Sequence, residues 1–287
     1  MDQRNKRPAI SIKFLLLSVL FFLNSCSSAV VLHSKGQVGS AEKTLMLVTA
    51  GLMLFVVLPA LCMTFLFAWK YRASHKLAKY SSEFIAEKRM EIVIWTIPTL
   101  IVLILSVLVW RDSHILDPYR PLQAQTRPLT IQVVSLDWKW LFIYPEQQIA
   151  TMNLIVFPVN VPVHFYLTSA TVMNSFFIPQ LGSQIMTMGG MQTQLYLMAN
   201  EPGTYAGISA NFSGRGFTGM DFKAIACSEK EFSSWIRSVK KVHRNLDFTA
   251  YQDIANPSVN NPVIYFSSVQ PHLFLDVIFN TSRKNPQ

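Results

Sequence analysis

Apolar residues gather in two long runs near the N-terminus of the chain and in many short runs after them. Residues 45–68 contain no charged side chain and would extend about 36 Å as a helix, which is enough to cross a bilayer. The first span is therefore predicted over residues 44–69, with a bend at Pro59. Residues 92–110 form a second, shorter run bounded by tryptophans, as membrane interfaces favour. Together the two runs predict a transmembrane hairpin.

From Leu129 onward the apolar residues recur in short runs separated by turn residues. These runs read LTIQVVS, WKWLFIY, MNLIVF, VHFYLT, QIMTM and QTQLYLM. Their β-branched and aromatic content, at a spacing of about 8 to 12 residues, is typical of a β-sandwich. Two further runs, residues 204–210 and 220–226, flank a loop of Asn, Ser, Gly and Phe, and a sandwich presents such loops at its ends. We therefore predict an all-β domain over residues 128–228, joined to the hairpin by a linker over residues 111–127.

A helix is predicted after the last strand, over residues 229–243. Ser228 stands at its N-cap and Glu231 at the third helical position, which is the signature of a capping box. Pro and Asn residues interrupt the remaining tail, which is expected to be short-helical or irregular. Its scattered aromatic residues are expected to pack against another protein surface; they are Tyr251, Tyr265, Phe266, Phe274 and Phe279.

Composition supports a chain that is partly membrane and partly globular. With 287 residues, 51% of them hydrophobic, and a mean hydropathy of +0.29, the chain is too apolar for a soluble protein and too mixed for a bundle of spans. Cys26, Cys62 and Cys227 lie far apart, so neither a disulfide framework nor a zinc site is indicated. The net charge is +9, but no basic patch with interleaved aromatics accompanies it, which argues against a nucleic-acid partner.

The N-terminus has the pattern of a cleavable signal peptide over residues 1–25. A basic segment precedes an apolar run at residues 14–23 that is too short to span a membrane. The run ends in Leu-Asn-Ser-Cys, which resembles a bacterial lipobox, so Cys26 is expected to become the lipidated first residue of a lipoprotein carrying fatty acids such as palmitate. The alternative is an ordinary signal peptide followed by an incidental cysteine.

Charge in the loops sets the orientation of the hairpin. The connection over residues 70–91 is rich in Lys and Arg, whereas residues 26–43 carry only Lys35 and Lys43. Because basic loops stay on the cytoplasmic side, the mature N-terminal segment and everything after Trp110 are expected in the periplasm. The sequence thus predicts a multi-pass, lipid-anchored protein of the bacterial inner membrane.

The loop between the last two strands resembles the copper loop of subunit II of the haem-copper oxidases. In members that take electrons from cytochrome c, this loop reads Cys, three residues, Cys, three residues, His, two residues, Met, with a Glu between the cysteines, and a further His lies upstream. Hydroxyl, amide and phenyl groups cannot replace thiolates and imidazoles as copper ligands. The corresponding positions here are Asn174, Ser209, Asn211, Ser213, Phe217 and Met220, of which only Met220 is retained.

Further segments extend the resemblance over nearly the whole chain. MEIVIWTIPTLIVLIL is similar to the second-span signature of oxidase subunit II, and SLDWKWLFIYPE to its aromatic segment. MNSFFIPQLGSQI, MANEPGTYAGISA and SGRGFTGMDFKAIA resemble the quinol-oxidising branch, subunit II of the cytochrome bo-type ubiquinol oxidases, whose members lack the copper ligands. The order of these segments along the chain makes the resemblance specific.

The resemblance implies a membrane-anchored, all-β fold in which a two-helix hairpin precedes a periplasmic cupredoxin-like sandwich. It further implies a non-catalytic subunit of a respiratory, proton-pumping complex that oxidises ubiquinol and reduces O2 to water. Such a chain would carry no cofactor, because haems and copper belong to subunit I, and would serve as a scaffold and periplasmic cap. The implied partners are subunits I, III and IV and the bilayer, without cytochrome c.

Glu91 opens the second span at the predicted cytoplasmic face. In the family the matching Glu stands at the entrance of a proton channel into subunit I, so the resemblance assigns Glu91 to proton uptake. The alternative is an acid favoured in the first helical turn by the helix dipole, worth about 0.3 to 1 kcal/mol.

Two other functions remain open from the sequence: a copper-containing cytochrome c oxidase subunit II, and a membrane-tethered binding lipoprotein outside any oxidase. Trp138 and Trp140 are expected to serve packing, as are the methionines at 186, 188, 191 and 198. No two histidines have ligand spacing, and each is expected at a surface or interface; they are His33, His75, His114, His164, His243 and His272.

Overall fold

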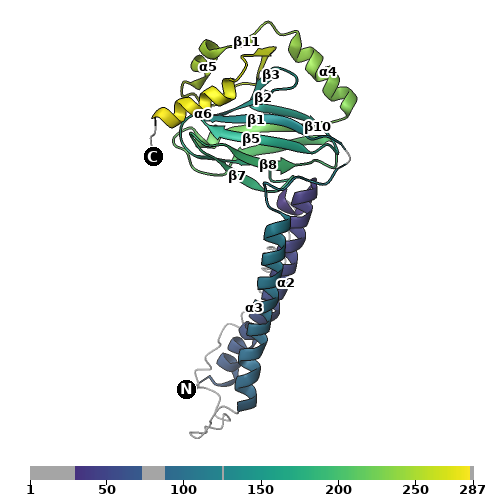
Figure 1. Ribbon diagram of the computed structural model, residues 1–287. Coiled ribbons are helices and arrows are strands. Elements are labelled where there is room, and N and C mark those ends of the chain that lie inside the picture. The colour runs from purple at the N-terminus through teal and green to yellow at the C-terminus, as the bar shows by residue number, and fades with distance from the viewer. Residues whose placement is uncertain (1–29, 73–87, 125, 285–287) are drawn as a thin grey trace, which may run out of the picture.

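The computed structural model describes residues 30–72, 88–124 and 126–284 of the chain. Two helices form a stalk, and a β-sandwich with a helical tail stands at one end of it (Figure 1). The predicted signal peptide, Cys26 with its predicted lipid, and most of the predicted cytoplasmic loop lie outside the described residues. These assignments therefore stay predictions.

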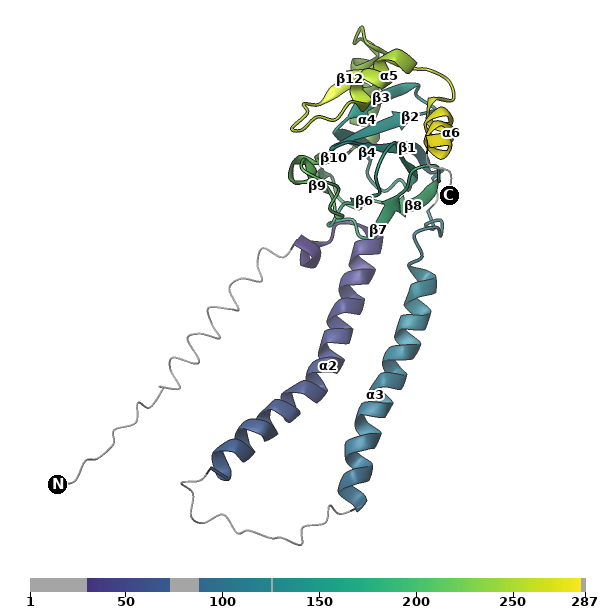
Figure 2. The same ribbon diagram turned by 90° about the vertical axis from the view of Figure 1, so that its left-hand side faces the viewer.

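A short 3-10 helix, η2 (Val30–His33), leads into the stalk helices α2 (Gln37–Lys70) and α3 (Lys88–Ile115). Both stalk helices are long and apolar enough to cross a membrane. They extend beyond the apolar runs in the sequence because their polar end turns are also helical. α2 bends partway along its length, as expected for a helix that contains Pro59 (Figure 2).

Two sheets pack face to face above the stalk. Strands β1 and β5 pair in parallel, as do β4 and β10, and the other sandwich pairings are antiparallel. The six-stranded sheet contains, in spatial order, β12 (Ile264–Phe266), β3 (Ile149–Met152), β2 (Lys139–Tyr144), β1 (Leu129–Leu136), β5 (Val163–Ser169) and β8 (Thr193–Leu197). The five-stranded sheet contains β4 (Leu154–Pro158), β10 (Asp221–Cys227), β9 (Gly203–Ser209), β6 (Asn174–Phe177) and β7 (Gln184–Thr187).

Within the predicted all-β domain, residues 128–228, the strands depart from the sequence prediction in two places. The single predicted run MNLIVF is divided at Asn153, whose positive φ of 56° ends β3 and lets β4 cross to the other sheet. Asn residues tolerate this left-handed conformation better than most. Strand β6 was not predicted, because its four residues begin with Asn and Ser and show little strand pattern.

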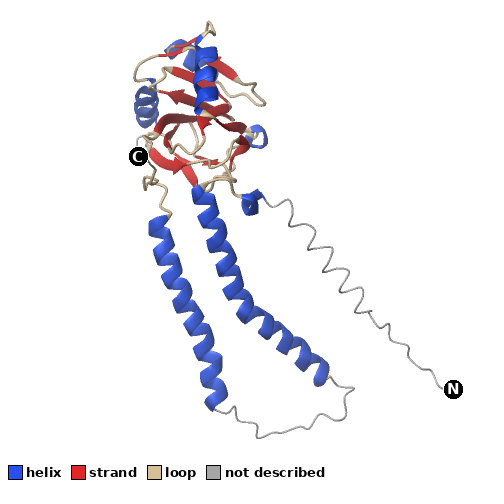
Figure 3. Cartoon of the chain, turned by 90° about the vertical axis from the view of Figure 1, so that its right-hand side faces the viewer, coloured by secondary structure: helices blue, strands red, loops and turns tan. Residues whose placement is uncertain are grey.

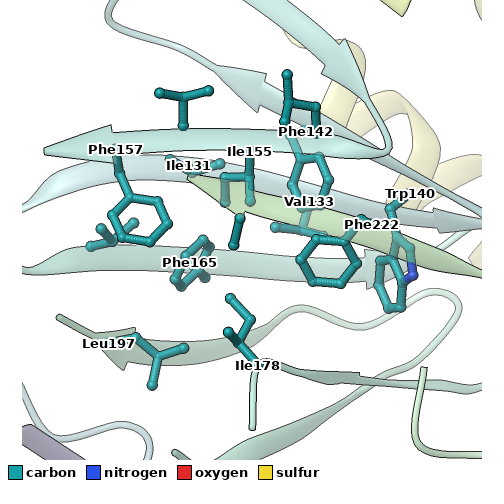
Figure 4. Packing of buried hydrophobic residues seen from close by; sticks show 14 of the residues in the cluster. Ile131, Val133, Trp140, Phe142, Ile155, Phe157, Phe165, Ile178, Leu197 and Phe222 are labelled. Carbon is teal, nitrogen blue, oxygen red and sulfur yellow. The ribbon is translucent and has the colours of Figure 1, made fainter. Parts of the chain in front are cut away.

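The main core fills the space between the two sheets (Figure 4). Aromatic rings dominate its centre: Phe176 and Phe222 stack at 5.1 Å between centroids, and Trp140 meets both rings edge-on. Trp140 is fully buried, which confirms that it serves packing. Burying rings of this size contributes roughly 1.5–3 kcal/mol each.

The tail after the sandwich packs back onto the outer face of the six-stranded sheet. Its elements are α4 (Glu229–Lys240), β11 (Asn245–Leu246), α5 (Phe248–Ala255), β12, β13 (Ser268–Val269) and α6 (Leu273–Lys284), and its helices lie above and beside the strands (Figure 3). Tyr251, Phe266 and Phe274 are buried in a second core on the outer face of β1, β2 and β3. The prediction of an external surface for these aromatics was therefore wrong, while Phe279 is exposed.

Helix α4 begins as predicted and ends earlier. The Ser228 hydroxyl accepts from the Glu231 backbone N–H, and the Glu231 carboxylate accepts from the Ser228 N–H, so the capping box is confirmed. The helix ends at Lys240 rather than at residue 243.

His164 was expected at a surface or interface, but its own chain leaves it only 9% exposed. Its ring stacks on Tyr196 at 4.0 Å and lies 4.1 Å from the ring of Tyr166, between strands β5 and β8. Its Nε2 is 3.1 Å from the Gln194 side-chain oxygen. The expectation was wrong because these neighbouring side chains cover the imidazole on the outer face of the sheet.

The stalk joins the sandwich by close backbone contact. The N–H of Gly39, in the first turn of α2, donates to the carbonyl of Leu181 at 2.8 Å. A Cβ at Gly36 would lie 2.8 Å from that same carbonyl oxygen, so the helix can approach the loop this closely only with glycine. Nearby, the Glu42 carboxylate accepts from both the N–H and the hydroxyl of Ser183, at 3.0 and 2.8 Å. These bonds give a partner both to the N–H of Gly39, which the helix itself leaves unpaired in its first turn, and to the N–H of Ser183 in the loop.

Candidate functional site

The positions that correspond to the copper ligands meet at one end of the sandwich. Asn174 begins β6, Ser209 ends β9 and Met220 directly precedes β10. The loop between β9 and β10 carries Ser213 and, in the short 3-10 helix η3 (Phe217–Gly219), Phe217. The structure therefore brings Asn174, Ser209, Ser213 and Met220, which the resemblance selected, to one end of the sandwich.

Asn174 lies at the centre of a buried hydrogen-bond network at this site. Its amide nitrogen donates to the carbonyl of Val172 at 3.2 Å and to the hydroxyl of Ser135 at 3.4 Å. Its amide oxygen accepts from the hydroxyl of Ser209 at 3.3 Å. Asn174, Ser135 and Ser209 are all buried, so the polar groups at this position satisfy one another.

Thr187 and Ser135 complete the network, although the sequence analysis did not select either residue. Their hydroxyl oxygens are 2.8 Å apart, and the Thr187 hydroxyl also donates to the carbonyl of Asn174 at 3.2 Å. Thr187 comes from β7 and Ser135 from β1, in the opposite sheet. Only the packing of one sheet on the other brings these residues together, so the sequence carried no signal for them beyond a polar residue in a buried strand.

The rest of the loop is held by separate contacts. Asn211 donates to the carbonyl of Met173 at 3.2 Å, and the Ser213 hydroxyl donates to the sulfur of the buried Met220 at 3.9 Å. Phe217 meets the ring of Phe212 edge-on at 5.7 Å. Phe212 is 76% exposed, although it is a large hydrophobic residue.

Trp138 connects this loop to the opposite sheet. It occupies the two-residue turn between β1 and β2 with a positive φ of 63°. Its indole N–H donates to the carbonyl of Ser213 at 3.0 Å. A Cβ at Gly214 would contact the indole at 3.2 Å, and one at Gly216 would overlap it, so both glycines allow the loop to lie flat on the ring.

The donor set does not fit copper. Thiolates and imidazoles hold this metal in cupredoxin sites, whereas here hydroxyl, amide and phenyl groups surround a single thioether. Among the residues that the structure describes, no group of three or more His, Cys, Asp or Glu side chains could hold a metal ion. Of these groups, the Asn174 amide and the Ser209 hydroxyl already bond each other inside the buried network, which also joins the two sheets through Ser135 and Thr187.

Lys139 is a second buried polar group that the sequence analysis missed. It starts β2 and is 2% exposed. Its ammonium group donates to the carbonyl of Asn256, just beyond α5, at 2.7 Å and to the hydroxyl of Ser258. Burial lowers the pKa of Lys139, and the nearby Asp137 carboxylate opposes this effect. Lys139 therefore ties the tail to the main sheet.

Glu91 lies apart from the sandwich. It is an exposed acid in the first turn of α3, at the end of the stalk farthest from the β-domain (Figure 2). This placement matches the predicted position at the start of the second span and leaves the role of the carboxylate as a prediction.

Comparisons with known proteins agree with this arrangement. The family described as the periplasmic domain of cytochrome C oxidase subunit II matches residues 129–225, and the family described as the COX aromatic rich motif matches residues 240–280. The first match covers the sandwich, and the second covers most of the tail.

Relatives match the chain over most of its length. Cytochrome bo(3) ubiquinol oxidase subunit 2 of Pseudomonas aeruginosa is 52% identical over 267 residues, covering 93% of this chain and 80% of that protein. The protein of the same name from Buchnera aphidicola subsp. Schizaphis graminum is 45% identical over 273 residues, or 94% of each chain. Quinol oxidase subunit 2 of Bacillus subtilis is 37% identical over 255 residues, covering 88% of this chain and 79% of that protein. The chain therefore belongs to the subunit 2 family of the cytochrome bo(3)-type ubiquinol oxidases.

Proposed function

We propose that this chain is a non-catalytic subunit of an inner-membrane complex that oxidises ubiquinol, reduces O2 to water and pumps protons. Its hairpin would pack against the membrane-embedded subunits, and its sandwich would cap the complex on the periplasmic side. The names of the relatives support a quinol as the electron donor.

The observation that carries the proposal is the donor set at the end of the sandwich. A subunit 2 that accepts electrons from cytochrome c needs a metal centre in this domain, and the network around Asn174 offers no thiolate or imidazole. Electrons from a quinol, which dissolves in the membrane, do not need to cross the periplasmic domain. The residues of this site are therefore free to serve packing alone.

The cofactors of the reaction would belong to another chain. Haems and copper are expected in subunit I, and subunits III and IV are the other expected partners. The large apolar side chains exposed along α2 and α3 support a membrane-embedded partner, because such surface is stable only against lipid or protein. Lipidation at Cys26 would add a further attachment of the periplasmic N-terminus to the membrane.

Metal content and electron donor together test the function. The purified complex should contain no copper beyond that of subunit I, should turn over with ubiquinol and should not turn over with reduced cytochrome c. Stoichiometric copper in this chain, or efficient turnover with reduced cytochrome c, would contradict the proposal and favour the copper-containing alternative. Purification of this chain without any haem-bearing polypeptide would favour a separate binding lipoprotein.

Glu91 is proposed to help collect protons at the cytoplasmic face. A Glu91→Ala variant should assemble normally and oxidise quinol more slowly, with fewer protons pumped. Glu229→Ala is the matched control, because Glu229 is also an exposed acid in the first turn of a helix, but on the periplasmic domain. Unchanged turnover and pumping in Glu91→Ala would remove the proton-uptake role and leave the carboxylate as a helix-dipole partner.

A further inference from the structure

A cavity of about 270 Å³ lies where the stalk meets the sandwich. The first turns of α2 and the end of α3 form its lower part, the linker after α3 forms one side, and two sandwich residues, Ser183 and Tyr196, complete it. Its volume is below the usual range for drug-sized ligands, so it suits a small polar group.

The depth of the cavity corresponds to the lipid headgroup region. Trp110 on α3 is 71% exposed and is the kind of residue that marks a membrane interface. Ile115, which lines the cavity, lies about 8 Å farther along the helix at about 1.5 Å per residue. On α2, Glu42 and Lys43 separate the long uncharged run from the cavity-lining residues. The headgroup layer is roughly 5–8 Å thick on each side of the hydrocarbon, so the cavity falls within or just above it.

The lining of the cavity changes from apolar to polar. Val38, Ala41, Ile115 and Leu116 give it apolar surface. The polar lining comes from Gln37, Asp117, Arg120, Gln123, Ser183 and Tyr196. A glycerophospholipid has the same two-part character where its phosphate joins the glycerol and acyl chains. A water-soluble ligand would not need the apolar part.

Two opposite charges line the cavity without pairing with each other. Asp117 and Arg120 begin and end a tight turn, in which the Arg120 N–H donates to the Asp117 carbonyl at 2.9 Å. The Arg120 guanidinium donates to the carbonyl of His114 at 3.3 Å, and within the described residues it forms no ion pair. The Asp117 carboxylate accepts from the N–H of Tyr119 at 2.9 Å. Both side chains therefore keep hydrogen-bonding capacity for a ligand.

From this geometry we infer that the cavity binds the headgroup of a zwitterionic phospholipid. The Arg120 guanidinium would bind the phosphate, and the Asp117 carboxylate would bind the ammonium group of an ethanolamine headgroup. Guanidinium pairs well with phosphate because its N–H groups match two phosphate oxygens at once. The acyl chains would continue along the stalk into the bilayer, so that one lipid stabilises the junction of hairpin and sandwich.

Cross-linking in the intact complex tests this inference. The purified oxidase is placed in nanodiscs of phosphatidylethanolamine and phosphatidylglycerol that contain a photoactivatable phosphatidylethanolamine, and the labelled peptides are mapped. Labelling is expected at residues 115–123. In Arg120→Gln it should fall about tenfold, because a charged hydrogen bond is lost. Arg127→Gln is the matched control, since Arg127 is a linker arginine outside the cavity, 3.5 Å from Glu146, and should leave labelling unchanged.

Further variants keep the test decisive. If Arg120→Gln does not assemble, Ala41→Trp should fill the cavity from α2 and abolish labelling with all charges in place. Asp117→Asn should remove the preference for a phosphatidylethanolamine probe over a phosphatidylglycerol probe. Excess inorganic phosphate should not compete with the lipid.

Three results would overturn the inference. Equal labelling of the wild-type, Arg120→Gln and Ala41→Trp complexes would show that the cavity does not hold the lipid. Loss of labelling with inorganic phosphate would show a site for free anions. If residues 115–123 of the wild type carry no lipid label and are cross-linked to another protein instead, another subunit fills the cavity.

Discussion

The indole nitrogen of Trp138 donates a hydrogen bond to the carbonyl oxygen of Ser213 at 3.0 Å, across 75 residues of sequence. The bond joins the turn between β1 and β2 to the loop that would carry metal ligands in a cupredoxin. With no ligand set in the loop, this tryptophan holds its backbone in place. A loop of Ser, Gly and Phe residues would otherwise keep much of its conformational freedom.

Trp138→Phe should loosen this loop without disturbing the sandwich. The substitution keeps a ring under Gly214 and Gly216 but removes the donor, so amides of residues 210–220 should exchange with solvent roughly five- to tenfold faster. Hydrogen exchange followed by mass spectrometry on the purified complex measures this. Trp235→Phe is the control, because the buried Trp235 indole nitrogen has no hydrogen-bond partner within the described structure. Unchanged exchange in Trp138→Phe would show that the ring alone orders the loop.

The polar network at the former ligand positions should be energetically coupled. Asn174→Ala removes the hydrogen bonds that this buried amide makes to Val172, Ser135 and Ser209, and it should lower the free energy of unfolding of the periplasmic domain by about 1–3 kcal/mol. Ser209→Ala should cost about 1 kcal/mol, and the double variant less than the two single changes together, because the two side chains share a hydrogen bond. Guanidinium unfolding followed by tryptophan fluorescence provides the free energies.

The control for the comparison of the two single variants with the double variant is Ser238→Ala. It removes an exposed hydroxyl on α4 and should change the free energy of unfolding by less than about 0.5 kcal/mol. Strictly additive effects of Asn174→Ala and Ser209→Ala would mean that the network does not act as a unit.

Much of this architecture follows from local sequence patterns. The run over residues 45–68 predicted a span because it is long, apolar and free of charged side chains that the hydrocarbon core would exclude. Ser228 and Glu231 predicted the start of α4 because both partners of a capping box lie within one helical turn. The resemblance to the copper loop likewise selected Ser209, Ser213 and Met220, which contact one another in the structure through Met220.

Features that depend on distant segments could not be predicted in this way. Strand β2 is buried along its whole length instead of alternating, because the tail covers its outer face. The apolar run that ends in LFIY is consistent with burial on both faces, but it does not say which segment provides the cover. Ser135, Lys139 and Thr187 became part of the site and its surroundings only because the two sheets pack together and the tail packs on one of them.

The stability of the periplasmic domain should rise with pH in the alkaline range because of Lys139. Burial lowers the pKa of Lys139 below its ordinary value of 10.5. Between the lowered pKa and 10.5 the unfolded chain binds more protons than the folded one, so the free energy of unfolding increases with pH there. Lys139→Met lacks this titrating group. The free energy of unfolding of the wild type should therefore rise relative to that of Lys139→Met by up to about 1.4 kcal/mol per pH unit across that window.

Unfolding of both proteins at pH 7 to 10.5 provides the comparison. Lys223→Met is the control, because Lys223 is an exposed lysine on β10 and its removal should leave the pH dependence of the wild type intact. Parallel pH profiles for the wild type and Lys139→Met would show that the ammonium group is not desolvated in the folded domain.

Gly36→Ala should disturb the junction between stalk and sandwich. The added Cβ would lie 2.8 Å from the carbonyl oxygens of both Leu181 and Met198, which are backbone atoms and cannot move aside independently. Overpacking of this kind costs about 1–3 kcal/mol. We therefore expect a lower melting temperature of the solubilised complex and faster amide exchange at Gly39 and Gly182, where helix and loop touch.

Gly51→Ala makes the same change inside α2, whose N-cap is Gly36, at a position where the new methyl group meets no atom within 4 Å. Because alanine is a better helix former than glycine by about 1 kcal/mol, this variant should be neutral or slightly stabilising. The contrast separates the contact from helix propensity, since both variants add one methyl group to a glycine at or within α2. Equal melting temperatures and equal exchange in the two variants would mean that the stalk does not need its close backbone approach to the sandwich.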